Sequence, residues 1–196
     1  MIYLKDTCVF INRFNSLGII QLLQNYKNST NSFGVTDIVI NELNPGRAVE
    51  AADAEKSKSM LGVVNLLEKS RDLVKYDVET EEKYQKNFQK IRKQFYGHLN
   101  DLNFVKKALA KKEITNESFK NRTYKFKDYG ECSCIAVAML EPEEVSIVSD
   151  DKGRVFLKPN INLFDKYKES HGIKVLEYEE WLSECELNDY STSKSS

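Results

Sequence analysis

The feature that most constrains this chain is the position of acidic residues next to two short, largely apolar runs. The run Ile2–Leu4 is followed by Asp6, and the run Val145–Val148 is followed by Asp150 and Asp151. Each run is short and apolar enough to be a buried strand of a parallel sheet. Active sites of such sheets form at the carboxyl ends of the strands. We therefore expect these acids to converge, although most of the chain separates them.

Two more acids stand next to apolar segments in the middle of the sequence. Glu42 follows the β-rich segment Val35–Ile40, and Glu131 begins the stretch Cys132–Leu140, whose small and apolar residues predict a buried helix. Carboxylates that meet in one place repel each other unless a cation holds them. Because Mg²⁺ and Mn²⁺ prefer carboxylate and water oxygens, the set predicts a site for one of these ions and a metal-dependent hydrolase.

The order of elements predicts an α/β fold. Strand-like runs are separated by helical patterns such as Leu17–Tyr26, so we expect a three-layer α/β/α sandwich with a central parallel sheet. A last strand within Gly172–Leu176 and a short helix at Tyr178–Leu182 complete the pattern. The residues from about 50 to 127 contain no convincing strand and are interpreted as a helical insertion, with a break at Gly97.

The composition is that of an ordinary soluble globular protein. The chain has 196 residues, of which 41% are hydrophobic and 30% are charged, and this is enough for one core. No apolar run approaches the roughly 20 residues that a membrane span requires, and no signal-peptide pattern opens the chain, so we expect a cytoplasmic location and no membrane. The predicted organisation is a single domain over residues 1–185 and a disordered, Ser-rich tail over residues 186–196.

Other chemistries have little support in the sequence. The four cysteines lack zinc-ligand spacing and favour packed free thiols. No G-x-S-x-G nucleophile motif and no Gly-rich phosphate loop is present.

The net charge of −1 conceals an asymmetry along the chain. From Lys83 to Lys127, thirteen Lys and Arg stand against three acids, which gives a local charge of +10 and leaves −11 for the rest. A basic segment on an acidic body predicts a surface that meets the phosphates of a nucleic acid. The candidate phosphate contacts are Lys90, Arg92, Lys93, Lys106, Lys107, Arg122 and Lys125.

Four segments, in this order and at this approximate separation, make the chain resemble the PIN domains, a family of metal-dependent ribonucleases. Together with the last strand and helix, the resemblance covers roughly residues 1–45 and 128–182. The segments that carry it are Tyr3–Ile11, Val35–Leu43, Gly130–Ala138 and Ile147–Arg154.

The resemblance implies a Rossmann-like three-layer fold and the cleavage of RNA phosphodiester bonds with Mg²⁺ or Mn²⁺. Many bacterial members are toxins of toxin–antitoxin pairs, so the implied partners are RNA, a small antitoxin protein and a second copy of the chain. Thr7 would hold Asp6 in place. The implied acidic cluster consists of Asp6, Glu42, Glu131 and either Asp150 or Asp151.

Two departures from the family keep other interpretations open. The third acid of the family often lies where this chain has Cys132 and Ser133, so Glu131 is the available substitute. The insertion at about 50–127 is also longer than compact toxins carry. The alternative to a nuclease is a non-catalytic module of the same fold, whose basic segment binds a nucleic acid or an acidic protein without cutting it.

Overall fold

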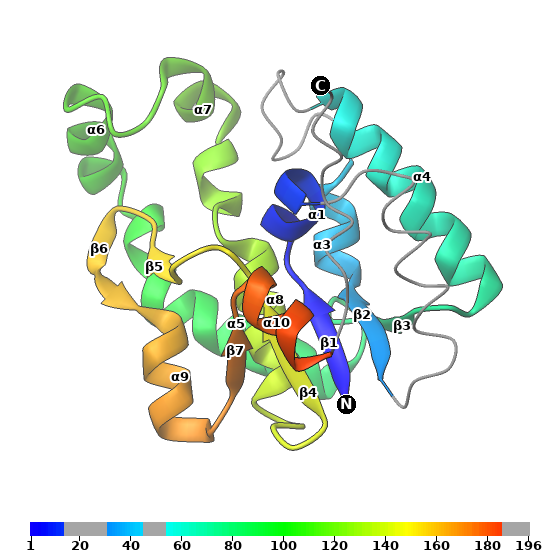
Figure 1. Cartoon of the computed structure of the whole chain (residues 1–196). Helices are drawn as coiled ribbons and strands as arrows, with labels where there is room; N and C mark the ends of the chain where they lie inside the picture. The colour runs from blue at the N-terminus through cyan, green and yellow to red at the C-terminus, as the bar shows by residue number, and fades with distance from the viewer. Residues whose placement is uncertain (14–30, 45–53, 186–196) are drawn as a thin grey trace.

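The structure, a computed structural model, describes residues 1–13, 31–44 and 54–185. These residues form an α/β fold with a central sheet of five parallel strands and helices on both of its faces (Figure 1). The predicted α/β class and the predicted parallel sheet are therefore confirmed. In spatial order the strands are β3 (Val74–Tyr76), β2 (Ser32–Thr36), β1 (Ile2–Lys5), β4 (Val145–Val148) and β7 (Lys174–Leu176).

All five strands are parallel, but the side of β1 on which new strands are added changes once along the chain. The chain builds outward from β1 to β2 and β3, and then returns to the other side of β1 to form β4 and β7. Ligands of open parallel sheets bind at such a switch point, outside the carboxyl ends of the strands. The register pairs Lys5 with Val148, so Asp6 and Ser149 leave the sheet side by side. The expected convergence of the first and last acidic segments follows from this register.

One small-residue helix lies at the centre of the molecule. Every residue of α8 from Gly130 to Ala138 is buried, because α8 packs on β2 and β4 while α5 covers its outer side. Small side chains such as Ala136 and Ala138 allow this close approach. The helices are α1 (Thr7–Arg13), α3 (Asp37–Glu42), α4 (Ala54–Ser70), α5 (Glu82–Tyr96), α6 (Leu102–Ala110), α7 (Asn116–Asn121), α8 (Tyr129–Ala138), α9 (Leu163–His171) and α10 (Tyr178–Glu184).

Short elements join these helices and strands. The 3-10 helices η2 (Gly97–Asn100) and η3 (Thr123–Phe126) flank α6 and α7, and an antiparallel hairpin of β5 (Arg154–Val155) and β6 (Lys158–Asn162) precedes α9. The break predicted at Gly97 is therefore confirmed. The predicted helix at Leu17–Tyr26 and the predicted tail lie outside the described residues. In the described ranges, the structure contains no helix with the length and apolarity that a bilayer crossing demands.

Two expectations about strands are wrong. The segment from about 50 to 127 contains β3, which pairs with β2 at the sheet edge; three residues are too few to give a periodic signal. The β-rich run Val35–Ile40 is divided, because β2 ends at Thr36 and α3 begins at Asp37. The Thr36 side chain accepts a hydrogen bond from the Val39 N–H at 3.1 Å, and this cap outweighs the strand propensity of the β-branched residues that follow.

Lys5 is a fully buried charged residue in the middle of the sheet. Its Nζ lies 3.5 Å from the centroid of the Trp181 ring and 5.0 Å from that of Phe33, and it donates a long hydrogen bond of 3.5 Å to the Tyr3 carbonyl. Its partners among the described residues are thus aromatic rings and a carbonyl. Burial lowers the pKa of this amine well below its usual value, so a charged Lys5 costs folding free energy.

We predict that Lys5→Met raises the free energy of unfolding at pH 7 by roughly 1–3 kcal/mol, because a flexible apolar side chain fills the same space without a desolvated amine. The unfolded chain binds more protons than the folded one wherever the pKa of Lys5 is lowered, so wild-type stability from this group rises with pH. The gain from Lys5→Met should therefore shrink towards pH 10 in urea titrations. An unchanged or negative effect at pH 7 would contradict this account.

Candidate functional site

Asp6 stands at the carboxyl end of β1 and is 4% exposed. Its Oδ1 accepts the Thr7 N–H at 2.7 Å, and its Oδ2 accepts the Ser149 hydroxyl at 3.2 Å and the Cys8 thiol at 3.4 Å. These donors hold the carboxylate at the switch point between β1 and β4. Burial nevertheless dominates and raises the pKa of Asp6 to about 6.

Glu42, the last residue of α3, faces the same place from the β2 side. Its Oε2 accepts the Thr7 hydroxyl, and its Oε1 accepts the Gly130 N–H at 3.0 Å. Thr7 therefore bonds two of the predicted acids, Asp6 through its backbone and Glu42 through its side chain. Burial first, and then the charge of Asp6, raise the pKa of Glu42 to about 7.

Gly130 lies in close contact with the side chains of Asp6, Thr7 and Glu42. A Cβ atom at this position would lie 2.5 Å from Glu42 Oε2, 2.7 Å from Asp6 Oδ1 and 2.9 Å from the Thr7 hydroxyl. Only a residue without a side chain lets the first turn of α8 approach the two carboxylates this closely. The small-residue character of α8 is thus a requirement of the site as well as of packing.

Glu131 projects from the first turn of α8 and is 5% exposed. Within the described part of the chain its Oε2 atom is buried and has no hydrogen-bond partner. Burial, followed by the charges of Asp6, Asp128 and Asp151, raises the pKa of Glu131 to about 11. A buried carboxylate oxygen without a donor is costly, and it is the kind of group that a bound cation satisfies.

Asp128 joins the cluster although the sequence did not single it out. Its Oδ2 accepts the Tyr96 hydroxyl at 2.8 Å and the Phe156 N–H at 2.9 Å. Burial raises its pKa, and its charge in turn raises the pKa values of Glu42 and Glu131. Its place just before Gly130 is the only sequence signal that could have indicated it. Asp128 precedes α8 in a left-handed conformation (φ 60°), and no apolar strand leads to it.

The structure separates the two acids that follow β4. Asp150 Oδ2 accepts the Arg13 Nε–H at 2.5 Å, and its Oδ1 accepts the Tyr178 N–H at 3.3 Å, so this side chain connects α1 with α10. Asp151 is exposed and faces the cluster, since it is among the charges that act on Asp6 and Glu131. Of the pair, Asp151 is the one that the fold brings to the other acids.

The acids fit a cation by their chemistry. The buried Asp6 and Glu131 and the half-buried Glu42 have raised pKa values, and the Oε2 of Glu131 has no hydrogen-bond partner among the described residues. Oxygen donors are the ligands that Mg²⁺ and Mn²⁺ take. Among the described residues, however, no group of three or more His, Cys, Asp or Glu side chains is already arranged as a set of metal ligands. Glu42 uses both of its oxygens to bond protein donors. A cation would therefore draw mainly on the remaining carboxylates.

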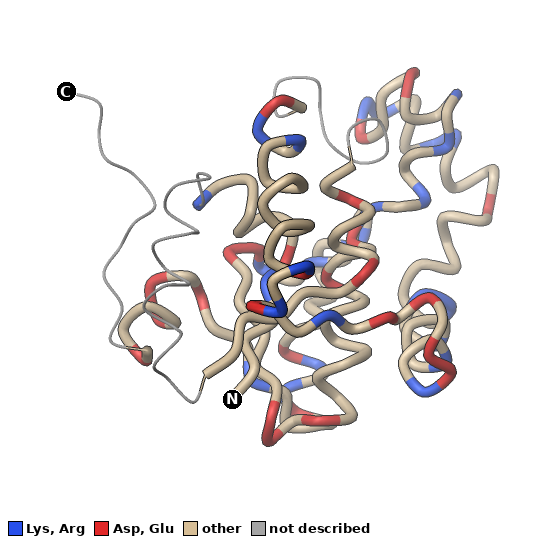
Figure 2. The backbone as a smooth tube through the Cα atoms, turned by 90° about the vertical axis from the view of Figure 1, so that its right-hand side faces the viewer, with Lys and Arg blue, Asp and Glu red and all other residues tan. Residues whose placement is uncertain are grey.

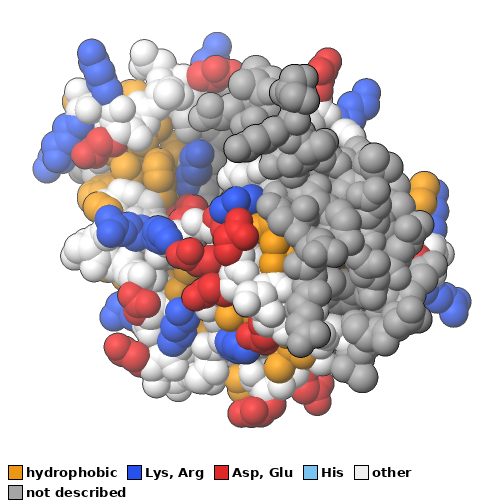
Figure 3. Space-filling model, in the orientation of Figure 1, with side chains coloured by type: hydrophobic (Ala, Val, Ile, Leu, Met, Phe, Trp, Pro, Cys, Tyr) orange, Lys and Arg blue, Asp and Glu red, His pale blue; other side chains and the backbone are white. Residues whose placement is uncertain are grey.

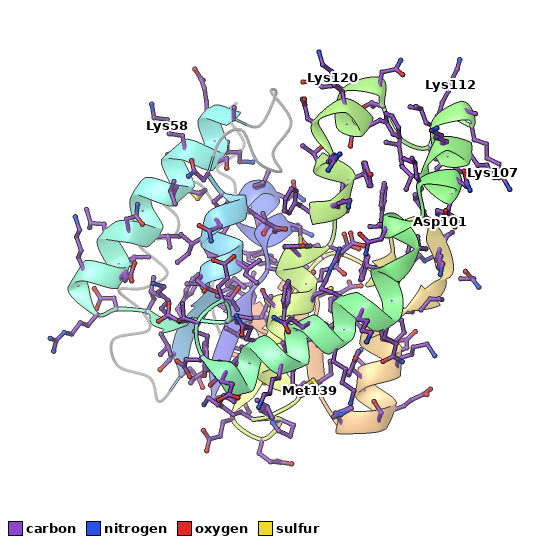
Figure 4. All side chains as sticks on the ribbon, turned by 180° about the vertical axis from the view of Figure 1, so that it is seen from behind. Lys58, Asp101, Lys107, Lys112, Lys120 and Met139 are labelled. Atoms are coloured by element: carbon purple, nitrogen blue, oxygen red, sulfur yellow. The ribbon has the colours of Figure 1, made fainter. Side chains whose placement is uncertain are left out.

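The basic segment from Leu102 to Phe126 lies at the α6–α7 end of the molecule. From Leu102 to Phe126, seven Lys and Arg stand against two Glu, and Figure 2 shows charges of both signs on the elements around the sheet. In Figure 4 the labelled Lys107, Lys112 and Lys120 lie at the α6–α7 end of the molecule, and Met139 lies at the opposite end. The carboxyl ends of the strands point towards the α6–α7 end (Figure 1). Figure 3 shows acidic side chains near the centre of one face with basic side chains around them.

The candidate phosphate contacts divide into exposed and structural residues. Arg92 is half-buried and donates to the backbone carbonyls of Lys127 at 2.8 Å and Lys125 at 2.9 Å, so its guanidinium fixes the chain before α8. Lys125 donates to Asn100 Oδ1 at 3.2 Å. The candidates whose side chains remain exposed are Lys90, Lys93, Lys106, Lys107 and Arg122.

Comparison with known proteins finds no family model that matches this sequence and no curated protein that is similar to it.

We predict that Gly130→Ala lowers the free energy of unfolding by about 1–3 kcal/mol, because the new methyl group meets the two carboxylates. The matched control is Gly62→Ala in α4, where an added Cβ meets no atom within 4 Å. That variant should gain about 0.5–1 kcal/mol from helix propensity. Urea titration measures both variants, and a stabilising Gly130→Ala would refute the close approach at this position.

A second prediction concerns pH and uses Glu131→Gln in EDTA. The pKa of Glu131 is raised in the folded state, so its protonated form gives stability below about pH 4.5 that is lost as the pH rises. Glutamine does not ionise and therefore removes this loss. The free energy of unfolding of the variant should exceed that of the wild type by about 1–3 kcal/mol at pH 8 and match it near pH 4. Thermal unfolding across this range measures the difference. A difference that does not change with pH would show that Glu131 is not held protonated.

Proposed function

We propose that this protein is a metal-dependent endoribonuclease with a PIN-like fold. The observation that carries the proposal is the buried Oε2 of Glu131, which lacks a donor beside Asp6, Asp128 and Asp151 at the switch point of a parallel sheet. Carboxylates collected in this way repel one another unless they are protonated or a positively charged ligand binds among them. Mg²⁺ and Mn²⁺ are the ions that match this oxygen chemistry.

Each residue of the cluster has a part in the proposed reaction. Asp6, Glu131 and Asp151 would hold the cation, which supplies a Lewis acid for water and for the phosphate under attack. Thr7 and Gly130 orient the Glu42 carboxylate through the hydrogen bonds that they donate. Because the pKa of Glu42 is about 7, this group can accept the proton of the attacking water at neutral pH. The oxygen of the water would add to phosphorus, one ester P–O bond would break, and the leaving oxygen would take up a proton from solvent.

The choice of RNA as substrate depends on the charge distribution and on the resemblance to PIN domains. The exposed lysines of α6 and α7 would bind the phosphate backbone on the side of the cluster from which the strands' carboxyl ends are reached. The same proposal includes a role as a toxin, a small antitoxin protein as a partner, and a homodimer. These three expectations are based on the resemblance to PIN domains.

Cleavage by purified protein tests the proposal. With single-stranded and structured RNA and Mn²⁺ or Mg²⁺, we expect cutting that EDTA stops and that Asp6→Asn lowers by about 100-fold or more. Asp151→Asn should also slow the reaction. Asp150→Asn is its neighbouring control, and it should cut at nearly the wild-type rate while losing about 0.5–1 kcal/mol of stability with the Arg13 ion pair.

Two outcomes would count against the nuclease. Cutting by Asp6→Asn at the wild-type rate would exclude the cluster as the active site. Binding of RNA without cutting, unaffected by EDTA and weakened steeply by salt, would support the non-catalytic binding module instead.

A further inference from the structure

Phe126 is an apolar side chain left in solvent beside the acidic cluster. It is 47% exposed at the end of η3, whereas Tyr124 in the same 3-10 helix is 5% exposed. It lies two positions before Asp128, so their Cα atoms are at most about 7 Å apart. Exposed aromatic rings in such positions lose the free energy of burial unless another molecule covers them.

The ring of Phe126 packs against a neighbouring aromatic side chain. Its centroid lies 5.3 Å from that of Tyr129 in an edge-on contact, and Tyr129 in turn contacts Phe88 at 5.3 Å. Arg92 lies between Tyr129 and Tyr96, with Cζ 4.3 Å and 3.6 Å from the two ring centroids. The same guanidinium bonds the carbonyls on both sides of Phe126. A fixed backbone and a supporting ring make Phe126 a rigid surface.

The charges next to Phe126 identify what could cover it. Lys125 and Lys127 precede and follow it, and the basic α6–α7 region lies before it in the chain. An apolar protein surface would bury these amines at a cost, whereas a nucleic acid offers a flat base together with phosphates. A base in a duplex is already stacked on its neighbours, so only an unpaired base has a free face for Phe126.

We propose that Phe126 is a stacking platform for an unpaired base next to the bond that is cut, and that the substrate is therefore single-stranded RNA. The position of the base next to a cleaved bond rests on the proposed function, but the stacking itself requires neither a metal nor cleavage. The exposed Lys127 contacts a phosphate next to the stacked base. The platform and the acidic cluster share the segment from Phe126 to Glu131, which fixes the distance between the bound base and the carboxylates.

The test measures binding in EDTA, where cleavage does not occur. The probe is a single-stranded RNA that carries one 2-aminopurine, a base whose fluorescence falls when it stacks on an aromatic ring. Wild-type protein should bind it with quenching, Phe126→Ala should bind about tenfold more weakly and lose the quenching, and Phe126→Trp should retain both. Leu140→Ala is the matched control, since Leu140 is 44% exposed and follows Met139 at the opposite end of α8 (Figure 4).

Each outcome decides the inference separately from the nuclease proposal. Equal binding and quenching by wild type and Phe126→Ala, or tighter binding of the same strand once it is annealed to its complement, would overturn the platform even if the protein cuts RNA. Loss of quenching in Phe126→Ala but not in Leu140→Ala would support the platform even if no cleavage is found. Equal losses in Phe126→Ala and Leu140→Ala would show a general change of the surface and would also overturn it.

Discussion

The repulsion between buried carboxylates at the switch point of the sheet is the constraint on which the rest of the site depends. Asp6 leaves β1 beside Ser149, and α8 brings Glu131 to within interaction distance of it. To hold these groups the fold uses nearly every donor available there: the Thr7 N–H and hydroxyl, the Gly130 N–H and the Ser149 hydroxyl. The donors do not suffice, because the pKa values of Asp6, Glu42 and Glu131 all remain raised. The packing of α8 and the glycine in its first turn are consequences of bringing the acids together.

A second network fixes the approach to the site. Arg92, between Tyr96 and Tyr129, bonds the chain carbonyls just before α8, and Asp128 accepts the Tyr96 hydroxyl from the same helix. The position of Asp128 in the acidic cluster therefore depends on α5. The basic residue that seemed suited to a phosphate is used within the protein, and the exposed lysines of α6 and α7 remain for a ligand. Such a division is reasonable, because guanidinium groups suit several fixed acceptors at once while ammonium groups suit mobile, solvated contacts.

Much of the fold could be predicted from the sequence because burial leaves a strong pattern. The runs before Asp6 and Asp150 are short and largely apolar, and they predict β1 and β4 at nearly their observed bounds. The edge strand β3 gives no sequence signal, because three residues are too few to show a period. The residues of α3 have the composition of a strand, and their helix depends on the cap by Thr36. The acidic cluster likewise contains residues that have a sequence signal and residues that have none. Acids next to apolar runs were recognised, but Asp128 follows no strand, and the different roles of Asp150 and Asp151 depend on contacts with Arg13 and Tyr178 that are far away in sequence.

The buried cations of the described chain do not neutralise the cluster, and this makes an external cation the simplest partner for it. Lys5 directly precedes Asp6, but its amine lies against Trp181 and Phe33, and burial lowers its pKa. Arg92 acts on Asp128, yet its N–H groups are directed to carbonyls. The cluster must therefore gain protons or bind a cation from solution, and the two alternatives compete for the same oxygens. If a cation binds at neutral pH, Glu131 must release a proton, because its raised pKa keeps it protonated while Asp6, with a pKa of about 6, is already largely ionised; the unpartnered Oε2 then becomes the oxygen best placed to act as a ligand.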